Sequence, residues 1–168
     1  MRENDDKIDA LEAALFNECE LVNMPVKHTF VSGMYIREIF MPKGENGIVN
    51  VVTSMVHNTE HPYFVMKGKV AVFSDNEGEE IIEAPFMGIT RKGTRRVLRI
   101  IEDVVWATVH RTDIKPENES EEAIEKAVAL IGEQILEKHE NKYTVSTNEN
   151  EHKYLLIPIF LDVKSEIN

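Results

Sequence analysis

The chain has 168 residues, enough for one domain with extensions, and 42% of them are hydrophobic, which excludes a fully disordered protein. Its formal net charge is -11, from 19 basic and 30 acidic residues, and this acidity argues against a surface built to bind duplex nucleic acid. The single cysteine, Cys19, excludes an intramolecular disulfide, and no apolar run approaches the roughly 20 residues of a membrane span.

The N-terminus is acidic and lacks the apolar stretch of a signal peptide, so we do not expect secretion by that route. Residues 5–22 are predicted to form a helix, because Ile8, Leu11, Leu15 and Cys19 recur at three- and four-residue spacing. Cys19 lies on this apolar stripe. We interpret it as a small core residue, since a nucleophile would need an adjacent base.

From His28 to about Thr112 the pattern changes to short β-branched runs separated by turn residues, with no helix between them. Such a series predicts an all-β domain, an antiparallel barrel or jelly roll. The predicted strands cover residues 35–41, 48–56, 63–66, 69–73, 80–84, 86–90, 95–101 and 104–110.

A second helix is predicted from Ser120 to about His139 after a polar linker. Its apolar stripe consists of Ile124, Val128, Ile131 and Ile135, widened by Ala127, Leu130 and Leu136. The helix should therefore bury one face against another surface.

The segment from Tyr154 to Val163 is apolar and is interrupted by Pro158, which predicts an edge strand or arm. The chain then has three parts: an N-terminal helix (1–23), a barrel (24–112) and a C-terminal helix and arm (113–168). The apolar extensions must either wrap their own barrel or pack against another subunit. We expect a homo-oligomer or an assembly with other structural proteins.

Two histidines, His57 and His61, precede an alternating strand pattern, and His110 ends another strand. A catalytic metal site usually needs three protein ligands, and His110, Glu60 or Glu38 could complete the set. A divalent metal is the cofactor that such a set would hold. The alternative is that the histidines form hydrogen bonds within the mouth of the barrel.

Arg37 and Glu38 are adjacent in one predicted strand, so one of the two charges should point inward. A buried charge is costly unless it is paired, which predicts a polar barrel interior. Arg96 carries a permanent positive charge and only donates hydrogen bonds, so its partner should be an anion. That anion is either an internal carboxylate, Glu38 or Glu83, or a bound ligand.

The run 91–96, together with Arg99, is the one basic patch of this acidic chain. It would suit contact with nucleic acid, and it would equally suit a solvated loop at the rim of a barrel.

The segment ending at Gly68 resembles the first motif of the cupin superfamily, which implies a cupin-like jelly-roll barrel. The four positions that usually hold metal ligands in that family fall on Met55, His57, His61 and Arg96. Only two of these are plausible metal ligands. The resemblance covers roughly residues 28–112, and the family includes enzymes, binding proteins and storage proteins.

Six further segments carry a second resemblance: 25–30, 33–39, 57–62, 83–90, 92–97 and 106–110. Together they resemble small cupin-like proteins encoded by tailed bacteriophages and prophages. This resemblance implies a phage origin and a place in the virion or in the cytoplasm of the bacterial host.

These observations predict a non-enzymatic phage protein, a structural or interaction module built on a degenerate cupin barrel. One alternative is a metal-dependent cupin enzyme or sensor that uses His57 and His61. Another is a binder of a small anionic ligand through Arg96, which predicts a concave pocket that exposes this side chain.

Overall fold

The computed structural model of the chain describes residues 5–19, 22–74, 78–133 and 156–159. Its helices are α1 (Asp5–Glu18), the short 3-10 helix η1 (Pro116–Asn118) and α2 (Glu121–Ile131). Its strands are β1 (Val26–Val31), β2 (Met34–Met41), β3 (Val49–Thr53), β4 (Val56–His57), β5 (His61–Lys67), β6 (Lys69–Ser74), β7 (Gly78–Glu83), β8 (Phe86–Thr90), β9 (Arg96–Ile100), β10 (Val104–Arg111), β11 (Gly132–Glu133) and β12 (Leu156–Ile159).

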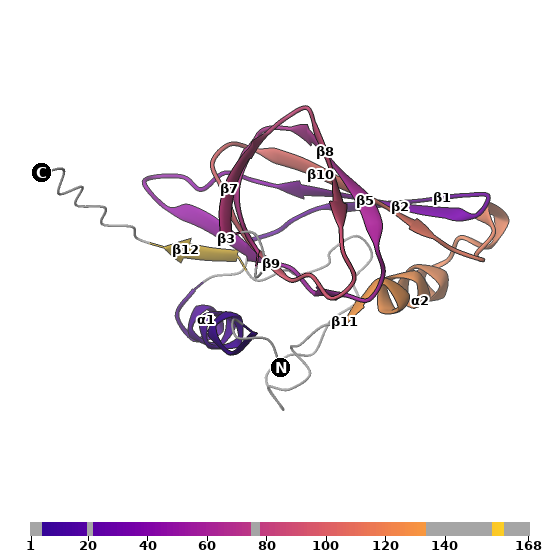
Figure 1. Cartoon of the computed structure of the whole chain (residues 1–168), viewed down its shortest axis with the longest axis horizontal. Helices are drawn as coiled ribbons and strands as arrows, with labels where there is room; N and C mark the ends of the chain where they lie inside the picture. The colour runs from indigo at the N-terminus through magenta and orange to yellow at the C-terminus, as the bar shows by residue number, and fades with distance from the viewer. Residues whose placement is uncertain (1–4, 20–21, 75–77, 134–155, 160–168) are drawn as a thin grey trace, which may run out of the picture.

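Within these residues, two five-stranded antiparallel sheets face each other (Figure 1). One sheet has the order β1-β2-β10-β5-β8, and the other has the order β12-β3-β9-β6-β7. If β2, β3 and β5 to β10 are numbered 1 to 8 along the chain, the two orders become 1-8-3-6 and 2-7-4-5. That is the strand order of a jelly roll. The predicted fold class, an all-β antiparallel jelly-roll barrel with an N-terminal helix and a C-terminal extension, is confirmed in its architecture.

The core lies between the two sheets and is formed by side chains at alternate positions of the strands. Apolar side chains fill most of it: Met24, Met41, Val52, Tyr63, Val65, Val70, Val72, Ile82, Leu98, Ile100, Val104 and Trp106. The strands predicted from the sequence all form, with ends shifted by a few residues. Strand β1 was not predicted, because Lys27, His28 and Thr29 interrupt any apolar alternation there. It forms because it pairs along its whole length with β2.

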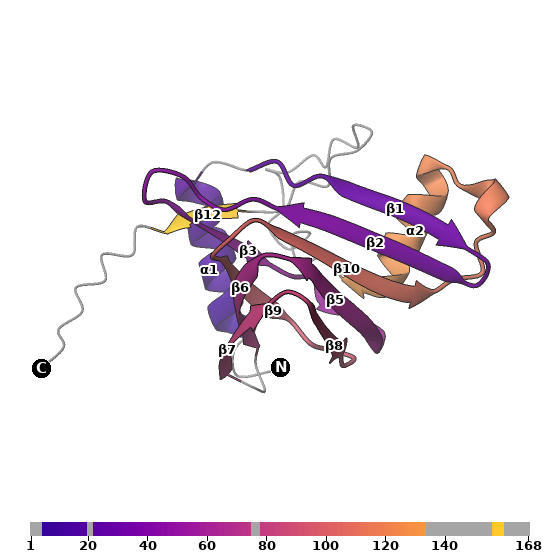
Figure 2. The ribbon, with the colours of Figure 1, turned by 90° about the horizontal axis from the view of Figure 1, so that it is seen from above.

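Helix α1 covers the outer face of the sheet that contains β3 and β9 (Figure 2). Ile8 and Leu15 of its predicted stripe are buried, and Leu15 packs against Val51 of β3. The helix ends at Glu18 rather than at residue 22. The chain must be extended again by Pro25, whose carbonyl accepts a hydrogen bond from the amide of Phe40 at 3.0 Å.

Helix α2 begins as predicted, with the Ser120 hydroxyl accepting a hydrogen bond from the amide of Ala123. It ends at Ile131 instead of near His139, because Gly132 and Glu133 pair with β4. Its apolar face packs against Phe30, Tyr35 and Met55 at one end of the barrel (Figure 1), whereas Leu130 points to solvent. Ile135, Leu136 and the rest of the predicted helix lie outside the described residues. None of the described helices has the length and apolar character that crossing a bilayer requires.

Strand β12 adds to the edge of β3, with Leu156 opposite Val52 and Ile159 opposite Val49. This part of the predicted apolar arm therefore pairs with its own barrel. Residues 154–155 and 160–163 of that arm lie outside the described residues.

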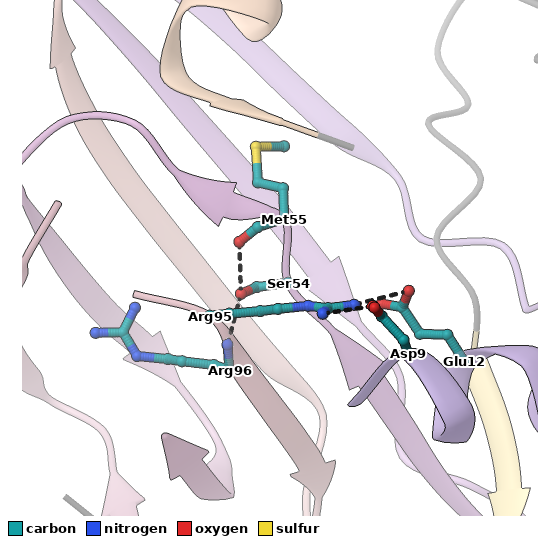
Figure 3. Close-up of polar contacts among 6 residues, drawn as sticks. All are labelled: Asp9, Glu12, Ser54, Met55, Arg95 and Arg96. Atoms are coloured by element: carbon teal, nitrogen blue, oxygen red, sulfur yellow. Dashed lines mark hydrogen bonds and ion pairs between the residues drawn. The ribbon is translucent and has the colours of Figure 1, made fainter. Parts of the chain in front are cut away.

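Helix α1 is tied to the barrel by a buried ion-pair cluster. The guanidinium of Arg95, which has no exposed surface, lies 2.8 Å from a carboxylate oxygen of Asp9 and 2.9 Å from one of Glu12 (Figure 3). The contact with Asp9 is also a hydrogen bond, whereas the contact with Glu12 is close without the alignment of one. Glu12 is almost fully buried, so α1 depends on this cluster as well as on its apolar face.

Removal of one partner of this cluster should destabilise the protein, because it leaves a buried charge uncompensated. We expect Glu12→Gln to lower the free energy of unfolding by about 3 kcal/mol. The matched control is Glu79→Gln, which breaks the exposed pair with Arg99 and should cost less than about 1 kcal/mol. Urea denaturation of both variants measures the difference. Equal losses would contradict the structural role of the cluster.

Candidate functional site

A partly open cavity of about 60 Å³ lies between the two sheets of the barrel. Strands β2, β3, β8, β9 and β10 contribute to its wall. The lining residues are Met24, Arg37, Ile39, Met41, Val52, Thr53, Ser54, Met55, His57, Thr90, Arg96, Leu98, Trp106 and Thr108. None of these carries a carboxylate, although two of them carry a guanidinium.

The cavity changes from polar to apolar along the strands. On β2 the inward positions run from Arg37 through Ile39 to Met41. On β10, Thr108 lies opposite Arg37 and Trp106 lies opposite Ile39, so the second strand repeats the change from polar to apolar. On β9, Arg96 is followed two residues later by Leu98. Since side chains two residues apart share a face, each of these strands turns one polar and one apolar member into the cavity. Arg37 and Arg96 both act on the pKa of His57, which places the polar members of β2 and β9 at the same end.

Arg96 is buried at the polar end of the cavity. Its Nη1 donates a hydrogen bond of 3.0 Å to the hydroxyl of Thr90, and its guanidinium carbon lies 5.0 Å from the centre of the Tyr63 ring. The Tyr63 ring stacks on Trp106 at a centroid distance of 4.4 Å. A Cβ at Gly88 would collide with the Tyr63 ring, so β8 needs glycine there to leave the ring its place. Arg96 is thus held in position by aromatic and hydroxyl groups.

Arg37 and not Glu38 is the inward member of its pair. Arg37 lines the cavity, whereas Glu38 points outward and forms an ion pair of 3.1 Å with Lys27 on β1. The predicted ion pair between Arg96 and Glu38 does not form, because alternation along β2 puts Glu38 on the other face of the sheet. Glu83, the other predicted partner, pairs with Lys69 at 3.1 Å.

The three predicted ligand histidines lie together beside the polar end of the cavity. The ring centres of His57 and His61 are 4.8 Å apart, and those of His61 and His110 are 4.2 Å apart. His61 Nδ1 donates to the carbonyl of Thr59 at 3.0 Å, and His110 Nε2 pairs with the Thr108 hydroxyl at 2.9 Å. Among the described residues, no group bonds to His57 Nδ1, His61 Nε2 or His110 Nδ1.

All three imidazoles are held neutral. Burial, followed by the neighbouring His61, Arg96, His110 and Arg37, lowers the pKa of His57 to about 2. Burial, followed by His61 and Arg37, lowers the pKa of His110 to about 3. The pKa of His61 is lowered mainly by burial, with the Thr59 carbonyl opposing the shift. The region is therefore electropositive through its guanidinium groups and not through its histidines.

This arrangement does not fit a divalent metal well. Within the described ranges, no group of three or more His, Cys, Asp or Glu side chains is arranged to hold a metal ion. The same two arginines that lower the pKa of His57 would repel a cation beside it. The metal site at His57, His61 and His110 stays a prediction, which the structure supports only by bringing the three rings together.

The basic run 91–96 is not a single surface. Arg95 and Arg96 are buried and point in opposite directions, towards α1 and into the barrel (Figure 3). Arg91 pairs with Glu60, and Arg99 pairs with Glu79 at 3.3 Å. The interpretation of the run as a solvated rim loop is wrong for Arg95 and Arg96, because each occupies an enclosed position on one side of the sheet.

The sequence did not indicate the roles of Thr90, Thr108 and Tyr63. Alternation along 104–110 does place Thr108 on the same face as Trp106 and His110, so part of the signal was present. The contact of Thr90 and Tyr63 with Arg96 depends on three different strands. Only the folded barrel brings them together.

No protein-family model and no curated protein matches this sequence. An RmlC-like cupin with a double-stranded β-helix fold from Methanocaldococcus jannaschii is 13% identical over 55% of this chain and 90% of that one, with a TM-score of 0.42. The Schizosaccharomyces pombe Cnp3 cupin domain is 16% identical over 70% and 80%, with a TM-score of 0.43. An RmlC-like cupin from Shewanella frigidimarina is 9% identical over 55% and 84%, with a TM-score of 0.42. Similarity at this level transfers no function, and the phage resemblance stays a prediction.

The buried neutral histidines should make the protein sensitive to acid. Above pH 6.5 they are neutral in both the folded and the unfolded chain, so they cause no pH dependence. Below pH 6.5 the unfolded chain binds protons that the folded state excludes down to about pH 3 at His110 and about pH 2 at His57. Each histidine should then lower the free energy of unfolding by up to about 1.4 kcal/mol per pH unit.

We therefore expect His57→Gln to lose less stability than the wild type between pH 6.5 and pH 4. Urea denaturation across this range measures the slope, and the carboxylates common to both proteins cancel in the difference. Lys92→Gln, a substitution at an exposed position that does not line the cavity, is the control. Identical slopes for His57→Gln and the wild type would show that His57 binds protons equally in the folded and the unfolded chain, which would contradict the lowered pKa.

Proposed function

We propose that the barrel interior binds a small anion. The observation that carries this proposal is the charge of the cavity wall, which includes two buried guanidinium groups and no carboxylate among its lining residues. A buried guanidinium is strongly stabilised by an anion that accepts its hydrogen bonds. Burial lowers the pKa of Arg37 to about 10, so this group still carries its charge at neutral pH.

The other polar groups of the wall suit the same ligand. Thr53, Ser54, Thr90 and Thr108 supply hydroxyl groups, and His57 supplies a ring nitrogen without a hydrogen-bond partner in the described part of the chain. Buried polar atoms are nearly always satisfied, so such a nitrogen is consistent with a polar ligand or a bound water beside it. The binding function needs no residue to act as a nucleophile or a base.

A second candidate function is the assembly of two copies through β8. In such a dimer the exposed apolar surface of the barrel would be buried between the copies. On the outer face of β5 and β8, Phe64, Met66, Met87 and Ile89 are between 37% and 57% exposed. Phe64 lies directly opposite Met87, so these side chains form one patch. In the described ranges β8 pairs on one side only, with β5.

The two sheet edges β7 and β8 differ in charge. Strand β7 has the sequence GEEIIE, and its three glutamates discourage pairing with another strand. Strand β8 has the sequence FMGIT and carries no charge. Antiparallel pairing of two β8 strands centred on Gly88 would put Met87 opposite Ile89 of the second copy on the same face. This self-complementary register favours a second copy as the occupant. A phage origin and a place in a virion stay predictions.

Anion binding should depend on Arg96. We expect Arg96→Gln to lose at least tenfold in affinity for whichever of chloride, sulfate, phosphate or acetate binds the wild type, measured by calorimetry at constant ionic strength. Arg99→Gln is the matched control, because Arg99 lies on the same strand and points outward to Glu79. Circular dichroism checks that both variants fold, and Arg37→Gln tests the second cation independently. Unchanged affinity in both cavity variants would refute the site.

The assembly candidate predicts a dimer that depends on β8. We expect light scattering after size exclusion to give twice the chain mass for the wild type and the chain mass for Met87→Lys. Ile81→Lys is the control, because Ile81 is 58% exposed on β7 of the other sheet. A monomeric wild type, or a dimer that survives Met87→Lys, would rule out this interface.

A further inference from the structure

We infer that the ligand of the barrel is a short-chain aliphatic monocarboxylate, of the size of acetate to butyrate, bound with its carboxylate at the Arg37–Arg96 end and its alkyl chain towards Leu98 and Trp106. This inference rests on the proposed anion-binding function and narrows it to one chemical class.

The first argument is the polarity of the wall. Strands β2, β9 and β10 each present a polar and an apolar side chain to the cavity. The register between β2 and β10 places their polar side chains opposite each other, and likewise their apolar ones. The apolar end consists of Met24, Met41, Val52, Leu98 and Trp106, all buried. A ligand that satisfies both ends must itself have one charged and one apolar end. Inorganic sulfate or phosphate would leave the apolar end unused.

The second argument is the size of the cavity. One water molecule occupies roughly 10–15 Å³ of such a cavity. The volume of about 60 Å³ therefore has space for about four to six groups of the size of a water molecule. Acetate has four non-hydrogen atoms and butyrate has six. Longer fatty acids, sugars and nucleotides do not fit within this volume and would have to extend through the open side of the cavity.

The third argument is the number and type of donors. A carboxylate accepts several hydrogen bonds, and guanidinium groups match its planar geometry. Among the lining residues in the described part of the chain, Arg37, Arg96 and Thr108 supply donors at the polar end, and the apolar end offers one donor, the indole nitrogen of Trp106. A dicarboxylate would therefore bury its second charge against apolar side chains, which is strongly unfavourable.

The stacked rings give the chain of the ligand a surface to contact. Trp106 lines the cavity and is stacked at 4.4 Å on Tyr63, which in turn lies under Arg96. An alkyl group beside the indole would bury apolar area with each added methylene. Affinity should therefore rise from acetate to butyrate by about three- to fourfold per methylene group.

The test is calorimetric titration of the wild-type protein with acetate, propionate, butyrate, hexanoate, succinate, sulfate and phosphate at one ionic strength, with propanol and propylamine as uncharged and cationic analogues. We expect affinity to rise to propionate or butyrate, to fall by at least tenfold at hexanoate, and to be absent for the two analogues. If sulfate or phosphate binds as tightly as butyrate, this inference is overturned while the anion-binding function stands. If no anion binds, both fail.

A variant of the apolar end tests the orientation. We expect Leu98→Ala to enlarge that end and to move the preferred ligand to a longer chain, with hexanoate gaining at least tenfold relative to propionate. Ile82→Ala is the matched control, since Ile82 is a buried core residue that does not line the cavity, and its preference should not move. An unchanged preference in Leu98→Ala would overturn the orientation. If that variant does not fold, the chain-length series of the wild type decides alone.

Discussion

The alternation of side chains along β2, β9 and β10 is the constraint on which the rest of the structure depends. Because successive side chains point to opposite faces, Arg37 enters the barrel while Glu38 meets Lys27 outside. The same rule sends Arg96 into the cavity next to the outward-facing Arg95. Within each pair, Arg37 with Glu38 and Arg95 with Arg96, the two side chains lie on opposite faces of their sheet. The lining residues of the cavity therefore include two arginines and no carboxylate.

Arg95 and Arg96 are adjacent in the sequence but have different roles in the structure. Arg95 meets Asp9 and Glu12, and this buried cluster holds α1 on the barrel. Arg96 meets the Thr90 hydroxyl and the face of Tyr63, and these two contacts orient its guanidinium. Burying a cation opposes folding, whereas a buried cation that lines a cavity favours the binding of an anion. Stability and recognition therefore make opposite demands on the barrel interior.

The histidines belong to the same electrostatic picture. Burial and the nearby arginines lower the pKa of His57 and of His110, so these rings contribute neutral hydrogen-bonding groups at physiological pH. Neutral rings do not add to the repulsion between the buried cations. They also leave the guanidinium groups as the source of charge that an anion would meet. The ring nitrogens without partners in the described residues mark the part of the wall where a polar ligand atom would be accepted.

The sequence by itself determined the barrel class and most strands, because alternation and turn residues are local signals. It also indicated a charged side chain inside the barrel, because Arg37 and Glu38 share one strand. It did not predict β1, since only pairing with β2 makes that polar segment extended. The helices predicted from the sequence were longer than α1 and α2. Pro25 bonds to β2, and Gly132 and Glu133 pair with β4, so both helices end earlier than their apolar patterns indicate. Tertiary structure alone decided that Glu38 does not reach Arg96 and that Thr90, Tyr63 and Arg96 meet, because such contacts depend on which strands become neighbours across the barrel.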